Sequence, residues 1–355
     1  MHWGNQGGTV SRLKRRVVAL IAALALAAIP ISGGAAGGFN GPLFGLATAP
    51  NGAILVADAS TGIIPIRNDI AGEAIPIPGA TAVSPIRGTS MWVTTGAGGD
   101  PTLNTGQALH QTDGTETRMI VDLYEFEASV NPDGNDPFDS NPYDVASLGS
   151  NAALVVDAGG NDLLQVNRNG SVHVLAVFPD ELVSTANIKA LAGCPESGAD
   201  FCFLPEQIPG QAVPTSVAIG PDGYYYVGEL KGFPGPTGES NIWRVHPRAS
   251  WAECGSSPDC VKVFDGGFTS IVDLAFDPKG TLYVVELDEA SWAAVEIFGV
   301  VTGGTLNACN VHTLACDVVA GSIPMLTAVT LGNDRSIWVT QNSLIPGAAE
   351  VVQLP

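Results

Sequence analysis

Acidic side chains at a fixed place in a repeated motif are the residues of this chain best suited to chemistry. The motif is thirteen residues long, occurs six times, and closes with a polar residue that is acidic in four copies. In chain order the closing residues are Asp58, Thr95, Asp157, Glu229, Glu286 and Gln341. Gathered carboxylates bind a cation, share a proton or accept hydrogen bonds from turn amides.

A second acidic position lies immediately before the motif. If each motif is a hairpin with a two-residue turn, Asp144 faces Asp157 and Asp273 faces Glu286. Like charges directly opposed in a sheet are destabilising, so such pairs need a bridging cation, a shared proton or backbone donors. We therefore predict an acidic mouth at one end of the hairpins, with calcium as its candidate ion. Its members are Asp58, Asp144, Asp157, Glu229, Asp273 and Glu286. The alternative is that these carboxylates only bond turn amides.

The segment 131–142 is a second oxygen-rich candidate for calcium. It contains, in order, Asn131, Asp133, Asn135, Asp136, Asp139 and Asn141. Calcium takes six to eight oxygens from such residues, although the segment lacks the closing Glu of an EF-hand loop. A polar loop rich in turn formers is the alternative.

Catalytic motifs are scarce. The sequence has no G-x-S-x-G, no H-E-x-x-H and no P-loop. None of His110, His173, His246 and His312 has a nucleophile or a metal-ligand spacing beside it. The sequence therefore predicts no catalytic residue.

The repeat itself indicates the architecture. Each copy opens with an aliphatic residue and has valine ten positions later, and Asn51-Gly52 or Asp222-Gly223 between the two arms is a strong hairpin signal. Two further strands fit most intervals, so we predict an all-β six-bladed β-propeller of four-stranded antiparallel blades. The uneven intervals argue against a solenoid. Residues 37–40 are expected to supply an outer strand beside 350–354.

The N-terminal residues predict export. A basic stretch with Arg12 and Arg16 precedes an apolar run over 17–29 and small residues at 34–36. This pattern is typical of a secretory signal peptide over 1–36, followed by a single propeller domain over 37–355. An uncleaved anchor is the alternative. We expect a secreted monomer, extracellular or periplasmic, with no later membrane span.

Charge and cysteines narrow the partners and the compartment. The net charge of −20 disfavours nucleic acid and suits cations or positively charged ligands, although acidity can also serve solubility alone. Six cysteines fall as close pairs, which we expect to form local disulfides in an oxidising compartment. The pairs are Cys194 with Cys202, Cys254 with Cys260, and Cys309 with Cys316.

Several segments between the motifs resemble the ScyD/ScyE family of secreted, NHL-like β-propellers. They are 121–128, 131–134, 139–144, 157–163, 175–178, 213–217, 227–230, 232–234 and 268–274. The resemblance implies export and six blades, and it implies no settled reaction. More distant six-bladed relatives include calcium-dependent lactonases and gluconolactonase-like enzymes, an analogy of fold alone.

Three functions follow as hypotheses. The first is a secreted binding or scaffold propeller for a small molecule or a protein, with an acidic face that takes calcium. The second is a metal-dependent hydrolase of the lactonase type, in which the metal polarises a carbonyl. The third is a structural extracellular protein held by disulfides. The missing catalytic constellation favours the first.

Overall fold

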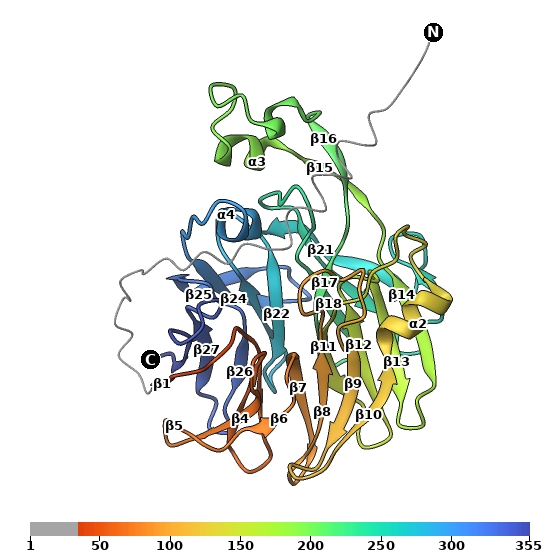
Figure 1. The fold of residues 1–355 in the computed structure, drawn as a ribbon, viewed down its shortest axis with the longest axis vertical. Coiled ribbons are helices and arrows are strands. Elements are labelled where there is room, and N and C mark those ends of the chain that lie inside the picture. Colours follow the sequence, from red (N-terminus) through yellow and green to blue (C-terminus); the bar gives the residue numbers. More distant parts are fainter. Residues whose placement is uncertain (1–34) are drawn as a thin grey trace.

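The repeated hairpin forms the two inner strands of each of six blades. The computed structural model describes residues 35–355, and six of its seven sheets are blades that surround a central axis (Figure 1). The predicted six-bladed β-propeller is therefore confirmed. The predicted signal peptide, 1–36, lies outside the described residues except for its last two.

The strands of blades 1 to 3 follow one another along the chain. Blade 1 contains β2 (Leu43–Thr48), β3 (Ile54–Asp58), β4 (Gly62–Arg67), β5 (Ile70–Ala71) and β6 (Ile75–Pro76). Blade 2 contains β7 (Ala80–Arg87), β8 (Ser90–Thr95), β9 (Ala108–Thr112) and β10 (Thr117–Asp122). Blade 3 contains β11 (Pro142–Ser147), β12 (Ala152–Asp157), β13 (Asp162–Asn167) and β14 (Val172–Val177), with β20 (Ala252–Glu253) added at its edge.

Blades 4 to 6 complete the ring. Blade 4 contains β17 (Pro214–Ile219), β18 (Tyr225–Glu229), β19 (Ser240–Val245) and β21 (Cys260–Phe268). Blade 5 contains β22 (Ile271–Phe276), β23 (Thr281–Glu286), β24 (Gly304–Asn310) and β25 (Cys316–Ile323). Blade 6 contains β26 (Val329–Leu331), β27 (Ile337–Gln341), β28 (Glu350–Gln353) and, from the other end of the chain, β1 (Ala35–Gly37).

The core is divided among the six junctions between blades. Six hydrophobic clusters are present, and each joins two neighbouring blades. The repeated valines lie in these clusters, and all six are fully buried: Val56, Val93, Val155, Val227, Val284 and Val339. The invariant valine of the motif is thus explained by packing between sheets.

A β-bulge changes the register of the inner hairpins. In blades 1 to 5 one residue of the first strand has no partner, two positions before the motif begins. Asp144 consequently pairs with Val156, and Asp273 pairs with Val285. The predicted oppositions of Asp144 with Asp157 and of Asp273 with Glu286 are therefore wrong, because a bulge adds one residue to one strand only.

Threonine hydroxyls tie even-numbered blades to the next blade. Three threonines near the start of the inner strands each donate a hydrogen bond to a backbone carbonyl of the following blade. The pairs are Thr81 with Pro142 at 2.9 Å, Thr215 with Ile271 at 2.6 Å, and Thr327 with Leu43 at 2.7 Å.

Aspartate carboxylates tie two odd-numbered blades to the next blade by accepting hydrogen bonds from its backbone. Asp144 of blade 3 accepts a hydrogen bond from the Val217 amide of blade 4 at 2.8 Å. Asp273 of blade 5 accepts one from the Val329 amide of blade 6 at 2.7 Å. In blade 1 the same position is Gly45, and a Cβ there would lie 2.8 Å from the carbonyl oxygen of Thr81. Blades 1 and 2 therefore pack too closely for a side chain at this point.

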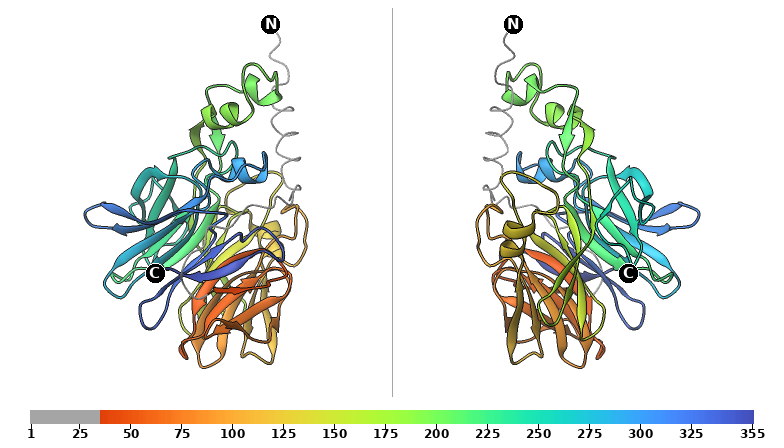
Figure 2. Two further views of the ribbon diagram at one scale, coloured as in Figure 1. Left: turned by 90° about the vertical axis from the view of Figure 1, so that its left-hand side faces the viewer. Right: turned by 90° about the vertical axis from the view of Figure 1, so that its right-hand side faces the viewer.

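The long connections gather at one face, which we call the upper face and define as the end where the inner strands begin. It carries α2 (Leu123–Val130), α4 (Trp292–Glu296) and an insertion of β15 (Glu181–Ser184), α3 (Ala186–Leu191), η1 (Asp200–Phe203) and β16 (Gln207–Gly210). The insertion projects from the disc (Figures 1 and 2). Among the described residues no helix is long and apolar enough to cross a membrane.

The three predicted disulfides are present. Cys194 bonds Cys202 in the projecting insertion between blades 3 and 4. The other two, Cys254–Cys260 and Cys309–Cys316, lie within blades 4 and 5. Each closes a short loop that has little apolar core of its own.

The closing strand yields the first prediction. Ala35, Ala36 and Gly37 pair with Val352, Val351 and Glu350, so a chain cut after Ala36 loses two of the three pairs. We expect a chain that starts at Gly38 to be less stable than one that starts at Ala35 by about 3 kcal/mol, from lost ladder bonds and the exposure of buried Ala36. Urea unfolding measures the difference, and equal midpoints would show that β1 does not close the ring.

Candidate functional site

The four acidic residues that close the motif bond to separate neighbours and do not form a shared mouth. Asp58 is fully buried and accepts four backbone N–H groups. One oxygen takes the amides of Asn40 and Gly41 at 2.9 and 3.2 Å, and the other takes those of Ser60 and Thr61 at 2.9 and 3.0 Å. This carboxylate therefore joins the chain entering blade 1 to the turn that leaves its second strand.

Asp157 likewise joins the chain entering blade 3 to the turn that leaves the second strand of that blade. Its Oδ1 accepts the amides of Asn141, Gly159 and Gly160, and its Oδ2 accepts the Ser140 hydroxyl at 2.6 Å. Burial raises the pKa of Asp157, and these donors oppose the rise. Turn amides thus explain Asp58 and Asp157 without a ligand.

Glu229 is neutralised by a buried lysine. The Nζ of Lys231 lies 2.7 Å from Glu229 Oε1 and 2.7 Å from Glu181 Oε2, and Lys231 is only 1% exposed. The indole of Trp243 donates to Glu229 Oε2 at 2.9 Å, and the amide side chain of Asn241 donates to Oε1. Glu229 therefore belongs to an ion pair that links blade 4 to the projecting insertion.

Glu286 bonds within blade 5. It accepts the Thr269 amide at 2.5 Å and the Asn307 side chain at 2.7 Å, and burial raises its pKa to about 7. Its neighbours are thus the strand entry and the third strand of its own blade.

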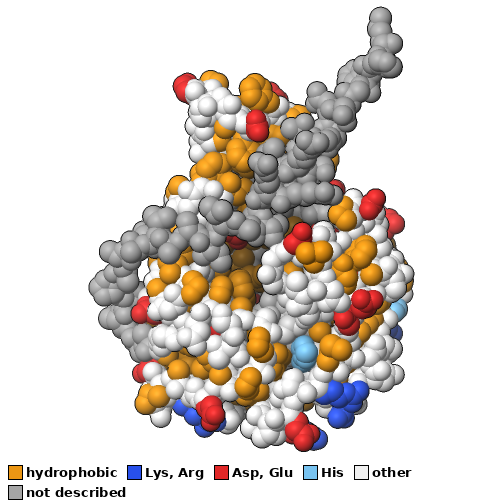
Figure 3. Space-filling view, in the orientation of Figure 1, with side chains coloured by type: hydrophobic (Ala, Val, Ile, Leu, Met, Phe, Trp, Pro, Cys, Tyr) orange, Lys and Arg blue, Asp and Glu red, His pale blue; other side chains and the backbone are white. Residues whose placement is uncertain are grey.

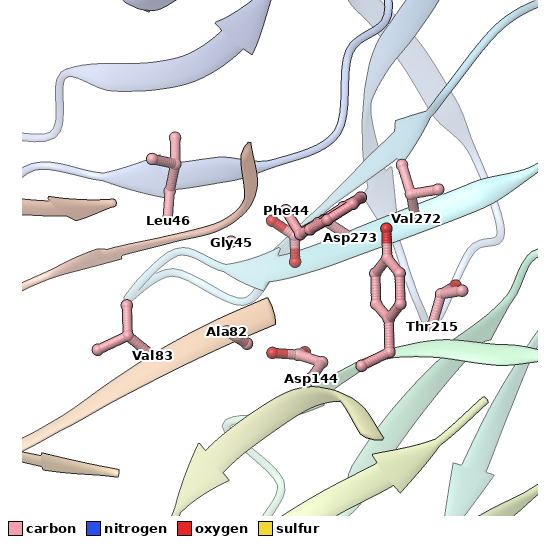
Figure 4. Close-up of a pocket in the computed structure, with 10 residues that line it drawn as sticks. Phe44, Gly45, Leu46, Ala82, Val83, Asp144, Thr215, Val272 and Asp273 are labelled. Atoms are coloured by element: carbon pink, nitrogen blue, oxygen red, sulfur yellow. The ribbon is translucent and has the colours of Figure 1, made fainter. Parts of the chain in front are cut away.

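Only Asp144 and Asp273 come together among the six predicted residues. They line the central channel, on β11 and β22, and both carboxylates project into the space between these strands (Figure 4). Phe44, Tyr143, Thr215 and Val272 also line this space. The space-filling view shows a hollow near the centre of the disc with hydrophobic side chains around it (Figure 3).

The channel carboxylates are held by amides and repel one another. Asp144 accepts the amide of Val145 at 2.7 Å in addition to that of Val217, and Asp273 accepts that of Leu274 at 2.8 Å in addition to that of Val329. Burial raises the pKa of Asp144 to about 7. Burial also raises the pKa of Asp273, and the charge of Asp144 raises it further. The pair therefore favours a proton or a cation between its members.

The channel carboxylates are already engaged by the backbone. Each of their four oxygens accepts an amide, which leaves them fewer free lone pairs for a calcium ion, a cation that takes six to eight oxygens. Within residues 35–355 no three Asp, Glu, His or Cys side chains converge as ligands of one metal ion do. The centre of a water molecule can occupy a volume of about 10 Å³ in this space. The space therefore has room for about one water molecule or one ammonium group.

Sequence reasoning missed the residues at the bulge. The unpaired position at the bulge faces the channel in four blades, where it is occupied by Phe44, Tyr143, Thr215 and Val272. The rings of Phe44 and Tyr143 meet edge to face, with their centroids 5.7 Å apart. The fixed place of these four residues two positions before each motif is the signal in the sequence. A second missed group, Glu127 and Asp162, lies outside the channel.

Comparisons with known proteins support the fold alone. No protein-family model and no curated protein matches the sequence. A gluconolactonase from Xanthomonas campestris is structurally similar, with a TM-score of 0.54, 11% identity and coverage of 90% of this chain and 88% of that one. A glucose dehydrogenase described as a putative oxidoreductase from Thermus thermophilus has a TM-score of 0.51, 15% identity and coverage of 90% and 98%. The aldose sugar dehydrogenase of Escherichia coli has a TM-score of 0.50 and 13% identity, with coverage of 90% of this chain and 98% of that one.

The fold and these neighbours define the class of the protein, which is a six-bladed β-propeller. At such identities the activities of the neighbours do not extend to this chain.

The amide cage of Asp58 can be tested by Asp58→Asn. The new NH₂ group would face two backbone N–H donors, so we expect a loss of roughly 2 to 3 kcal/mol in the free energy of unfolding. The exposed Asp69→Asn is the control. An unchanged urea midpoint for Asp58→Asn would contradict the structural role.

The channel pair predicts a pH dependence. A carboxyl whose pKa is raised by folding stabilises the protein at low pH, and this contribution disappears as the pH rises from about 4 through the raised folded value. Replacing Asp273 by Asn removes the contribution. Between pH 5 and 8 the unfolding free energy of the variant should therefore fall less steeply than that of the wild type, by up to about 1.4 kcal/mol per pH unit.

Urea titrations at four pH values measure these slopes. Asp317→Asn, on an exposed strand, should retain the wild-type slope. Parallel profiles for the wild type and Asp273→Asn would mean that Asp273 is ionised throughout the range.

Proposed function

We propose that the protein is an exported binding propeller that takes a small ligand with an ammonium group at the mouth of its central channel. The observation that carries the proposal is the pair Asp144 and Asp273. They face one channel, and none of the four ion pairs among residues 35–355 includes either of them.

The remaining hydrogen-bonding capacity of the pair suits an ammonium donor. A carboxylate offers about four lone-pair sites, and Asp144 and Asp273 each use two of them for backbone amides. An ammonium group has three donors and a positive charge, so it satisfies the free sites and removes the repulsion between the carboxylates. Phe44 and Tyr143 beside the pair offer aromatic rings to the same cation.

Export and relationship form part of the proposal. Three disulfides are typical of proteins from oxidising compartments, which supports the signal peptide predicted for 1–36. The resemblance to the ScyD/ScyE family supports the same location. We propose on these grounds a secreted, extracellular or periplasmic monomer.

A metal-dependent hydrolase of the lactonase type is the alternative, favoured by the structural similarity to a gluconolactonase. It would require a metal at the channel, where the oxygens already accept amides. Gluconolactone turnover that depends on calcium and is abolished by Asp273→Asn would support the hydrolase and contradict the binding function.

Calorimetric titration with n-butylammonium tests the binding function, with 1-butanol as the neutral probe of equal size. We expect the wild type to bind the ammonium ion and not the alcohol, and Asp273→Asn to bind the ammonium at least about tenfold more weakly, since one of two attracting charges is lost. Asp317→Asn should bind like the wild type.

The pH profile of the wild type tests the same proposal without a variant. Affinity for n-butylammonium should fall as the pH drops below about 7, because Asp144 takes up a proton there. Equal affinity for the ammonium and the alcohol, or affinity that is constant from pH 5 to 8, would overturn the proposal.

A further inference from the structure

A second acidic cluster lies at the upper face between blades 2 and 3, outside the channel. It consists of Glu127 from α2, Asn131 and Asp133 just after α2, and Asp157 and Asp162 at the two ends of the β12–β13 turn. Asp157 and Asp162 are registered partners across that turn, so two carboxylates oppose each other directly. Such an opposition is destabilising unless something compensates it.

Four oxygens of this cluster are buried without a donor. Both carboxylate oxygens of Asp162, Oε1 of Glu127 and Oδ1 of Asn131 receive no hydrogen bond from the described residues. Asp162 is 0% exposed and Glu127 is 1% exposed. Buried polar groups in proteins are nearly always satisfied, so four such atoms in one place need an explanation.

Asp133 and Asp157 already accept hydrogen bonds from neighbouring groups. Asp157 accepts three amides and a hydroxyl. Asp133 accepts the amide and the side chain of Asn135 at 2.9 and 2.6 Å and the side chain of Asn161 at 2.9 Å. These bonds position Asp133 and Asp157 and leave the free oxygens of Glu127, Asn131 and Asp162 as the unsatisfied set.

In the part of the chain that the structure describes, no basic side chain forms an ion pair with this cluster. The four ion pairs within residues 35–355 all involve Lys231 or Lys262 and lie elsewhere. Burial, followed by repulsion from Asp157, Asp133 and Asp139, raises the pKa of Glu127 to about 9. Burial and repulsion from Asp157, Glu127 and Asp133 raise the pKa of Asp162 well above its usual range. The cluster therefore requires positive charge.

We propose that Glu127, Asn131 and Asp162 bind a single calcium ion. The free atoms are all oxygens from two carboxylates and one amide, which is the donor set that a hard divalent cation prefers. They supply four of the six to eight ligands, and waters complete the shell. Gly160 leaves room beside them, since a Cβ there would lie 3.0 Å from Oε2 of Glu127.

Two carboxylates and one amide are the protein ligands of the proposed site. Within the described residues no three Asp, Glu, His or Cys side chains converge as metal ligands do, and the proposed set contains only two such side chains, those of Glu127 and Asp162. The bound ion joins α2 of blade 2 to the β12–β13 turn of blade 3.

Protons are the competing occupants. If Glu127 and Asp162 are neutral, each carboxyl proton must find an acceptor within the cluster, and the protein gains stability as the pH falls. Calcium and protons thus predict opposite pH dependence, because calcium binds the ionised carboxylates and must displace the protons that the raised pKa values of Glu127 and Asp162 retain.

Calcium addition to the chelator-treated whole protein at pH 7.5 tests the site. We expect one ion per chain by calorimetry and a rise of about 4 °C in Tm at a hundredfold excess over Kd. Asp162→Asn should abolish the calcium-dependent rise. In chelator this variant should melt at or above the wild-type temperature, since the amide replaces one of two directly opposed carboxyl groups.

Two controls separate this site from the others. Asp317→Asn, an exposed aspartate, and Asp273→Asn, in the channel, should both keep the full calcium-dependent rise. If Asp273→Asn loses it while Asp162→Asn keeps it, calcium binds in the channel and the inference fails. Absence of any rise, with stability greatest at acidic pH, would assign the cluster to protons and overturn the proposal.

Discussion

The ring of hydrogen bonds between inner strands is the interaction on which the rest of the molecule depends. Each blade packs on the next through apolar side chains, which fix no direction along the strands. The hydroxyls of Thr81, Thr215 and Thr327 and the carboxylates of Asp144 and Asp273 supply that direction, because each reaches one backbone group of the next blade. The alternation of hydroxyl and carboxylate gives even and odd blades different inner ends, and only two odd blades bring charge to the channel.

The acidity of the chain consequently has three physical meanings. At Asp58 and Asp157 the carboxylate accepts hydrogen bonds from backbone amides of the turns. At Glu229 it neutralises a buried lysine. At the channel and at Asp162 it exceeds what the protein's own donors and cations satisfy, and these are the two places where a ligand is proposed. Net charge alone does not separate these cases, since the number of donors around each carboxylate decides them.

The sequence was sufficient for the blades and insufficient for the site. The buried valine of each motif and the turn glycines, such as Gly52 with φ of +83°, predicted six hairpins because packing and backbone conformation are local demands. The bulge was not predicted, because an extra residue in one strand leaves the alternation of apolar side chains beyond it unchanged. Because of that extra residue, Asp144 and Asp273 pair with valines in the structure, whereas the sequence predicts that they pair with acidic residues.

The sequence predicts one part of the second acidic cluster and not the other. The oxygen-rich segment 131–142 was recognised, whereas Glu127 and Asp162 were not, because they approach that segment only through the packing of α2 beside blade 3. The opposition of Asp157 and Asp162 was readable in principle, since a four-residue turn separates them.

The pairing of β1 with β28 also sets the order in which the ring can form. Their partners are separated by more than three hundred residues, so the last sheet has no outer strand until nearly the whole chain is available. A chain that emerges from its N-terminus carries β1 as a free edge throughout synthesis, and the five other junctions can assemble first. The final closure is then a single long-range event at the outer edge of blade 6, which joins the first described strand of the chain to the last.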